Sequence, residues 1–267
     1  MERFVSVDPY HFHYQTAGCS NNPAILFLHG FMGDCREFEG AIAHLSNHYH
    51  CLTVDLPGHG KTQVATDEAY FIQNTAHGLI QFLRALRIQS CFLVGYSMGG
   101  RLALYLTLHF PHIFTKTALE SASPGLKTAA EQNQRIQHDF ALAEKLETNF
   151  PAFLKKWYEQ PLFHSLQRHP NFEKLLKQRS QNCPRQLAKS LRYLSVGCQP
   201  SLWQQIPQNT VPISLLVGEL DPKFVRINAE MSQLGKLMQF NLVKQCGHTI
   251  HFENANVFAE YVQLFLE

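Results

Sequence analysis

Short, uninterrupted apolar runs recur along this chain and alternate, in its first half, with segments of helical length. The runs lie at residues 24–28, 51–54, 91–94, 115–119 and 213–217. Continuous apolar runs of this length are typical of strands that are buried on both faces. Strands that alternate with helices predict a mostly parallel central sheet with helices on both faces. We therefore expect the chain to fold as an α/β protein.

One long segment departs from this alternation. Between residues 125 and 210, amphipathic stretches follow one another with no strand pattern between them, and prolines divide them into short helices. This pattern predicts a helical cap or lid inserted into the core. We therefore expect a first part of the core at 1–124, the cap at 125–210, and the second part of the core at 211–267. An antiparallel hairpin at 3–16 is expected to precede the parallel strands.

The composition limits the partners of the protein. Lys and Arg total 23 against 21 Asp and Glu, which gives a formal net charge of +2 with no basic run, so neither nucleic acid nor an anionic membrane is indicated. No stretch approaches the roughly 20 apolar residues of a membrane span, and the N-terminus lacks a signal-peptide pattern. The seven scattered cysteines include no C-x-x-C pair and predict reduced thiols in a cytoplasmic protein. The sequence leaves the oligomeric state open.

The motif Gly95-Tyr-Ser97-Met-Gly99 lies between an apolar strand-like run and a helix-like run. A G-x-S-x-G motif between a strand and a helix is the nucleophile elbow of α/β-hydrolases, in which a strained turn exposes the serine hydroxyl. The two glycines leave space for that turn. Ser97 is therefore the candidate nucleophile.

A serine hydroxyl needs a base, and the base needs an acidic residue to orient it. Asp221 follows the apolar run at 213–217, and His248 follows the expected last strand, which gives the α/β-hydrolase order Ser, Asp, His. Glu219 is a rival for the acid, but it lies closer to the strand end. His251 is a rival for the base, but we expect it to be structural.

The loop after the first parallel strand reads His29-Gly30-Phe31. In this fold that loop supplies one N–H of the oxyanion hole, and the residue after the nucleophile supplies the other. We therefore assign the oxyanion hole to the backbone of Phe31 and Met98. No metal-binding cluster or phosphate-binding loop is visible in the sequence, so no metal and no cofactor are expected.

Arg101 stands four residues after Ser97, one helical turn along, and therefore close to the nucleophile. A guanidinium near a partly buried helix start needs an anionic partner. One interpretation is an internal ion pair with Glu120 at the end of the next strand. The other is a clamp for a substrate carboxylate, to which the planar guanidinium is well suited.

The string Gly-Tyr-Ser-Met-Gly-Gly-Arg101 resembles the MenH-type 2-succinyl-6-hydroxy-2,4-cyclohexadiene-1-carboxylate synthases, which have the α/β-hydrolase fold. Arg135-x-x-x-Asp139, the stretch 153–163 and Arg179-Ser are also similar to that family. One difference is that the family usually carries an E-E-R run before Arg135, where this chain has Ala-Glu-Gln. The resemblance covers essentially the whole chain.

The resemblance implies a lyase of menaquinone or phylloquinone biosynthesis that eliminates pyruvate from 2-succinyl-5-enolpyruvyl-6-hydroxy-3-cyclohexene-1-carboxylate. Arg101, Arg135 and Arg179 would bind the carboxylates of this small polycarboxylate substrate. The triad would remove a proton α to the succinyl ketone, and the oxyanion hole would stabilise the enolate.

Three aromatic residues are further candidates for the substrate site. Tyr96 adjoins the nucleophile, and Trp157 with Tyr158 could roof the substrate from the cap, although packing within the cap explains the last two equally well. The triad by itself does not distinguish a lyase from a serine esterase, a thioesterase or a C–C bond hydrolase. Only the arginines favour the lyase, so the hydrolase alternative stays open at this point.

Overall fold

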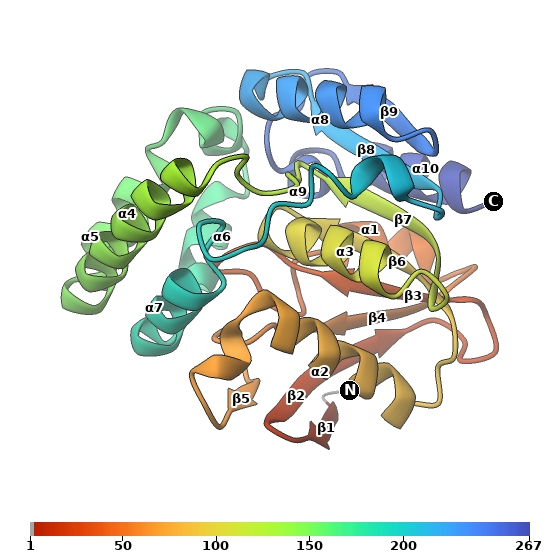
Figure 1. Cartoon of the computed structure of the whole chain (residues 1–267), viewed down its shortest axis with the longest axis horizontal. Helices are drawn as coiled ribbons and strands as arrows, with labels where there is room; N and C mark the ends of the chain where they lie inside the picture. Colours follow the sequence, from red (N-terminus) through yellow and green to blue (C-terminus); the bar gives the residue numbers. More distant parts are fainter. Residues whose placement is uncertain (1–2) are drawn as a thin grey trace.

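The computed structural model describes residues 3–267, and its centre is one twisted sheet (Figure 1). Its strands follow the order β1-β2-β4-β3-β6-β7-β8-β9, with the short β5 pairing with β2. In chain order they are β1 (Arg3–Val7), β2 (Tyr10–Ala17), β3 (Ala24–Leu28), β4 (His50–Val54), β5 (Gln63–Val64), β6 (Cys91–Tyr96), β7 (Phe114–Glu120), β8 (Ile213–Gly218) and β9 (Met238–Val243).

The sheet is parallel from β4 to β9, whereas β1, β2 and β5 pair antiparallel at one edge. The central strands β3, β6 and β8 are buried along nearly their whole length, as the continuous apolar runs predict. The predicted hairpin at 3–16 is confirmed by β1 and β2. The expected mostly parallel α/β core is therefore confirmed.

Helices cover both faces of the sheet. One face carries α2 (Ile72–Ala85), α3 (Met98–His109) and α8 (Pro222–Leu234), whose apolar residues form one core cluster with the strands. The opposite face carries α1 (Glu39–Leu45) and α10 (Ala255–Leu266), which form a second cluster. The short α9 (Ile250–Glu253) precedes α10. Alternate residues of each strand supply the two clusters, since strand side chains point alternately to opposite faces.

The segment between β7 and β8 is helical and stands to one side of the sheet (Figure 1). Its longer helices are α4 (Ala129–Thr148), α5 (Phe150–Tyr158), α6 (Phe172–Arg179) and α7 (Pro184–Tyr193). Their apolar faces form a third cluster, which reaches the core at Met32 and Phe31. The cap thus has its own small core. The division of the chain at residues 125 and 210 stays a prediction.

Two helices that position the site were not predicted from the sequence. α1 is seven residues long, which is too short for a clear amphipathic period. α8 begins directly after Asp221, which is its N-cap, and Pro222 is its first residue. An Asp followed by Pro is a recognisable helix start, so this signal was present.

Within residues 3–267, no helix is both long enough and apolar enough to cross a membrane.

Candidate active site

Ser97 lies on a strained turn between β6 and α3. Its backbone has φ 50° and ψ −105°, a conformation that costs energy for a residue other than glycine. The turn is possible because its two flanking glycines pack tightly. A Cβ at Gly99 would lie 2.1 Å from the Leu28 carbonyl oxygen, and one at Gly95 would lie 2.6 Å from the Gly99 carbonyl oxygen. The nucleophile elbow expected from the motif is present.

Ser97 is hydrogen-bonded to the two residues that the chain order selected. His248 Nε2 lies 3.1 Å from Ser97 Oγ, and His248 Nδ1 lies 2.7 Å from Asp221 Oδ2. Asp221 and His248 are each only 2% exposed, so water competes little for these bonds. The other carboxylate oxygen of Asp221 accepts a hydrogen bond from the backbone of Phe224 in α8. These contacts fix the acid and the base in a triad arrangement.

Two backbone N–H groups beside Ser97 are available to bind an anion. Met98 is the first residue of α3, where a helix has unpaired N–H groups, and Phe31 lies in the loop after β3. Neither N–H donates to an acceptor within residues 3–267. The loop of Phe31 is held by His29, whose Nδ1 donates to the Gly30 carbonyl oxygen while Nε2 accepts from the Leu56 N–H. An oxyanion hole at Phe31 and Met98 is compatible with this geometry.

Two cavities beneath the cap meet at Ser97 and His248, and we call them the outer and the inner pocket. The outer pocket has a volume of about 230 Å³, and the inner pocket about 60 Å³. Phe31, Ser97, Trp157 and His248 line both. The outer pocket also contains Met98, Arg101 and Arg135, and the inner pocket contains Tyr96, Tyr158 and Arg179. Ten of the eleven predicted site residues therefore line these two pockets, and Asp221 lies behind His248.

Arg101 lines the outer pocket and has only neutral partners. Its guanidinium donates to Gln199 Oε1 at 2.7 Å and to the Leu194 carbonyl oxygen at 2.9 Å. No carboxylate within the described chain pairs with it. Burial, together with the positive charge of Arg135, lowers the pKa of Arg101 to about 10. A partly buried cation without a bonded counter-ion is costly, so this position favours an anionic ligand.

The predicted alternative, an ion pair between Arg101 and Glu120, is wrong. Glu120 instead bonds His251, with its Oε2 2.7 Å from Nδ1 and its Oε1 3.1 Å from the backbone N–H. The reason is strand alternation: Glu120 shares its face of β7 with Ala118, which belongs to the cluster under α10. Arg101 is on α3, which covers the opposite face.

Arg135 also lines the outer pocket, but it already has a counter-ion. Its Nε lies 2.7 Å from Asp139 Oδ1, one helical turn along α4. Asp139 is fully buried and also accepts a 2.5 Å hydrogen bond from Ser195 Oγ. This carboxylate therefore joins α4 to the segment after α7 and orients Arg135 at the pocket. About a third of the Arg135 side chain remains exposed.

Arg179 of the inner pocket is a member of a buried ionic chain. It bonds both carboxylate oxygens of Glu37 at 2.6 Å, and Glu37 Oε1 lies 3.1 Å from His251 Nε2. Glu120 completes the chain on the other side of His251. Against the effect of burial, the charge of Arg179 and the contacts with His251 lower the pKa of Glu37 to about 2. The chain runs from cap helix α6 through the core, so His251 has the structural role expected for it.

The two predicted cap aromatics both line the inner pocket, and Trp157 also lines the outer one. The ring of Trp157 lies against Phe31, with centroids 5.1 Å apart, and lines both pockets. Tyr158 is buried in the inner pocket, where its hydroxyl accepts a hydrogen bond from Arg179 Nε at 3.3 Å. Tyr96 packs its ring on His248 and His251. All three contact the site, although Tyr158 also belongs to the core of the cap.

A second polar cluster, which contains His13, Cys35 and Asp55, lies away from the nucleophile. Its donor atoms come within 4.8 Å of one another, a spacing that a metal ion could span. They are already engaged, however. Asp55 accepts from His13 Nδ1 and from the backbone of Cys35 and Lys61, each at 2.7 Å. Burial raises the pKa of the Cys35 thiol far above its usual range, so the sulfur is protonated. The cluster orders the loop after β4.

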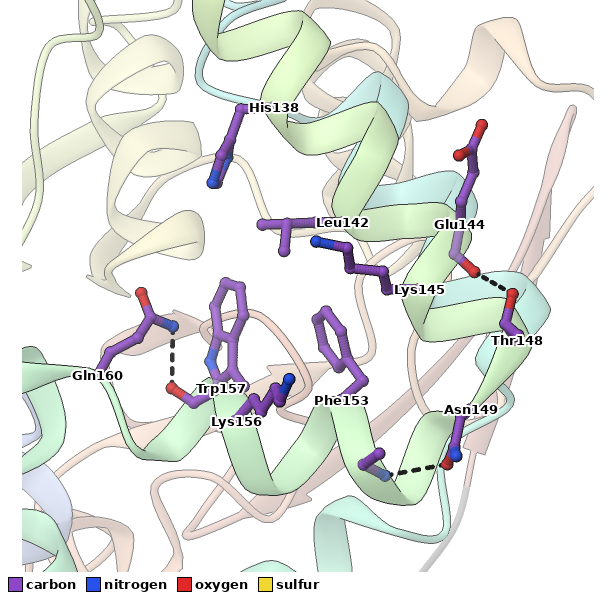
Figure 2. Close-up of a pocket in the computed structure, with 11 residues that line it drawn as sticks. His138, Leu142, Glu144, Lys145, Thr148, Asn149, Phe153, Lys156, Trp157 and Gln160 are labelled. Carbon is purple, nitrogen blue, oxygen red and sulfur yellow. Dashed lines mark hydrogen bonds between the residues drawn. The ribbon is translucent and has the colours of Figure 1, made fainter.

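The cap also has larger, more open hollows. One of about 740 Å³ lies between α4 and α5, where Leu142, Phe153 and Trp157 face into it and Glu144 points away (Figure 2). It contains no member of the triad. It shares Trp157 and Gln160 with the outer pocket, so the two cavities are neighbours. The candidate nucleophile Ser97 and His248 line the smaller outer pocket and not this hollow.

Three side chains of the site were missed by sequence reasoning. Gln199 orients Arg101, and Glu37 neutralises Arg179, across nearly 100 and more than 140 residues of sequence. No local pattern predicts such distant pairs. Lys223, which also lines the outer pocket, is only two residues after Asp221 and could have been found once the Asp-Pro start of α8 was recognised.

Comparison with known proteins agrees with this geometry. The α/β-hydrolase fold family matches residues 23–255. The chain is 32% identical over 251 residues to the 2-succinyl-6-hydroxy-2,4-cyclohexadiene-1-carboxylate synthase of Serratia proteamaculans (strain 568), covering 93% of this chain and 95% of that one. It is 33% identical over 247 residues to the protein PHYLLO, chloroplastic, of Arabidopsis thaliana, covering 86% of this chain and 14% of that larger protein. The structure of MenH from S. aureus superposes with a TM-score of 0.90 at 35% identity, covering 96% and 97% of the two chains.

Proposed function

The chain belongs to the 2-succinyl-6-hydroxy-2,4-cyclohexadiene-1-carboxylate synthases of the α/β-hydrolase fold, and from this premise we propose how its site performs the reaction. The enzyme is a carbon–oxygen lyase of menaquinone and phylloquinone biosynthesis. It eliminates pyruvate from 2-succinyl-5-enolpyruvyl-6-hydroxy-3-cyclohexene-1-carboxylate. The substrate is a small polycarboxylate, and the outer pocket is the proposed place for it.

The first step is the removal of the proton α to the succinyl ketone. Ser97 Oγ takes this proton while its own passes to His248 Nε2, and Asp221 stabilises the imidazolium that forms. The electron pair of the broken C–H bond becomes an enolate, whose oxygen is placed at the N–H groups of Phe31 and Met98. No acyl-enzyme forms in this scheme.

The second step expels the enolpyruvyl group. The enolate electrons move through the ring double bond and break the ring carbon–oxygen bond, which leaves the conjugated diene and the enolate of pyruvate. A proton returned by His248 converts that enolate to pyruvate. The protons and electrons balance without a cofactor, and the enzyme ends in its starting state.

The observation that carries this proposal is the uncompensated charge of Arg101 beside the triad. An esterase with a neutral substrate would gain nothing from a partly buried guanidinium that lacks a counter-ion, because nothing would offset its desolvation cost. A polycarboxylate substrate supplies the missing anion. Arg135 and Arg179 are proposed as supporting cations, since each already bonds a carboxylate of the protein.

The direct test is a stopped assay with the enolpyruvyl cyclohexene substrate that quantifies pyruvate and the cyclohexadiene product. We expect equal amounts of both products from the wild type. After the spontaneous background is subtracted, the kcat of Ser97→Ala should be about 100-fold or more below that of the wild type. Hydrolysis of simple activated esters at a higher kcat/KM than this elimination would favour the esterase alternative instead.

A cytoplasmic location is part of this proposal. It is supported by seven cysteines that all remain free thiols, four of them buried. Proteins of reducing compartments use cysteine in this way. Cell fractionation that follows the pyruvate-releasing activity tests it, and recovery of that activity outside the cytoplasm would contradict it.

A further inference from the structure

Lys223 lines the same outer pocket as Ser97 and Arg101, and it is the one lysine there. It enters from α8, two residues after Asp221, and therefore from the core side rather than from the cap. No carboxylate pairs with its ammonium group within residues 3–267, and its one aromatic contact is Phe224, at 5.6 Å from Nζ to the ring centroid. The ammonium group is thus at the exposed edge of the pocket, with no carboxylate of the described chain bonded to it.

The position of Lys223 conflicts with the local preference of its own helix. It is the second residue of α8, and the N-terminus of a helix carries a partial positive charge that disfavours cations there. Partial desolvation and the positive charge of Arg135 lower the pKa of Lys223, and the negative charge of Asp221 opposes them. Residues that break a local rule in this manner are expected at functional sites.

The charges of the outer pocket can be counted. Arg101, Arg135 and Lys223 bring three positive charges, and Asp139, which bonds Arg135, brings one negative charge. Two positive charges are left without a protein partner. Arg135 acts electrostatically on both Arg101 and Lys223, so the three cations form one group rather than separate surface charges.

We propose that Lys223 binds a carboxylate of the substrate, as a second cation beside Arg101 in the outer pocket. This inference rests on the proposed function, whose substrate carries three carboxylates. A solvent-exposed lysine with no role would be equally free of partners, but it would not line the pocket that holds the nucleophile. An ammonium suits this place because it offers three donors on a flexible stem at the solvent-exposed rim.

The expected kinetic signature follows from the charge of the ligand. A carboxylate remote from the reacting atoms keeps its charge through the reaction, so Lys223 binds ground state and transition state equally. Removing it should raise KM and leave kcat nearly unchanged. A purely structural role would differ. Lys223 contacts Phe224, whose ring lies 4.7 Å from that of His248, so a disturbance of packing would lower kcat.

The experiment compares Lys223→Gln with Lys223→Arg and with the control Lys236→Gln. Lys236 is exposed, follows α8 and lines none of the pockets described above. Its substitution therefore removes one positive charge away from the site. For Lys223→Gln we expect KM for the enolpyruvyl cyclohexene substrate to rise about 10-fold to 100-fold, as for a lost hydrogen bond to a charged group. Lys223→Arg should recover most of this loss, and Lys236→Gln should match the wild type.

Three results would overturn the inference. If KM is unchanged in Lys223→Gln while the wild type shows Ser97-dependent pyruvate release, the binding role of Lys223 is refuted and the proposed function stands. A fall in kcat with KM unchanged would assign it to packing around His248. The absence of Ser97-dependent release from the wild type would instead refute the proposed function, and this inference with it.

Discussion

The outer and inner pockets meet at the same serine, but Arg179 of the inner pocket is bonded to a carboxylate of the protein and Arg101 of the outer pocket is not. In the inner pocket, Arg179 bonds both oxygens of Glu37 and is part of a buried chain of alternating charges. In the outer pocket, Arg101 bonds only an amide and a carbonyl oxygen. This difference shows that an arginine near a nucleophile is not in itself a binding group for a substrate carboxylate. The absence of a protein counter-ion is the feature that indicates a ligand.

We expect the largest difference between the two pockets in the free energy of unfolding, and Arg179→Met should lower it most. The substitution leaves Glu37 buried with one partner fewer, and breaking a buried ion pair in this way costs about 3 to 5 kcal/mol of stability. Chemical denaturation measures the free energy of unfolding. The double variant Arg179→Met with Glu37→Gln should lose less than the sum of the two single variants, because it leaves no unpaired charge. Additive losses would show that the pair is not coupled.

Arg101→Met should show the reverse pattern. The free energy of unfolding should stay within about 1 kcal/mol of the wild type, since removal of an uncompensated charge offsets the hydrogen bonds lost by Gln199 and Leu194. The kcat/KM for pyruvate release should fall about 100-fold to 1,000-fold, which corresponds to about 3 to 4 kcal/mol. Full activity in this variant would show that Arg101 does not bind substrate.

The inner ionic chain should also make stability depend on pH. Burial lowers the pKa of His251, but Glu120 and Glu37 outweigh it and raise that pKa from 6.5 to about 9. A raised pKa means that this contribution is fully present below pH 6.5 and is lost as the pH rises towards 9. We expect a loss of about 3 kcal/mol over that range, measured by denaturation at several pH values. In His251→Gln the dependence over this window should flatten. An equally steep curve in that variant would place the effect elsewhere.

The sequence predicted the core side of the site better than the cap side. Strands β3, β6 and β8 and the residues Ser97 and His248 follow from local patterns, because short buried strands and tight turns restrict which residues are allowed. The position of Arg101 near the nucleophile follows from the helical period.

The distant partners of Arg101 and Arg179 could not be predicted in this way. Gln199 and Glu37 come from segments that meet these arginines only in the folded chain, and no periodicity links them. Asp139 differs, because it lies one helical turn from Arg135 in α4. The pairing of Arg101 with Glu120 was wrong because nearness in the predicted fold does not give the face of the sheet. Both residues lie near the same end of the sheet, but the Glu120 side chain points to the face opposite α3 and bonds His251.

The most direct test of the account is the equilibrium affinity of the enolpyruvyl cyclohexene substrate for protein that cannot turn it over. Isothermal titration of the Ser97→Ala protein, with and without Arg101→Met, isolates binding from chemistry. We predict a Kd about 100-fold higher when Arg101 is replaced, with melting temperatures that differ by only about 2 to 4 °C. An equal Kd in the two proteins would contradict the claim that the uncompensated cation of the outer pocket is there to bind the substrate.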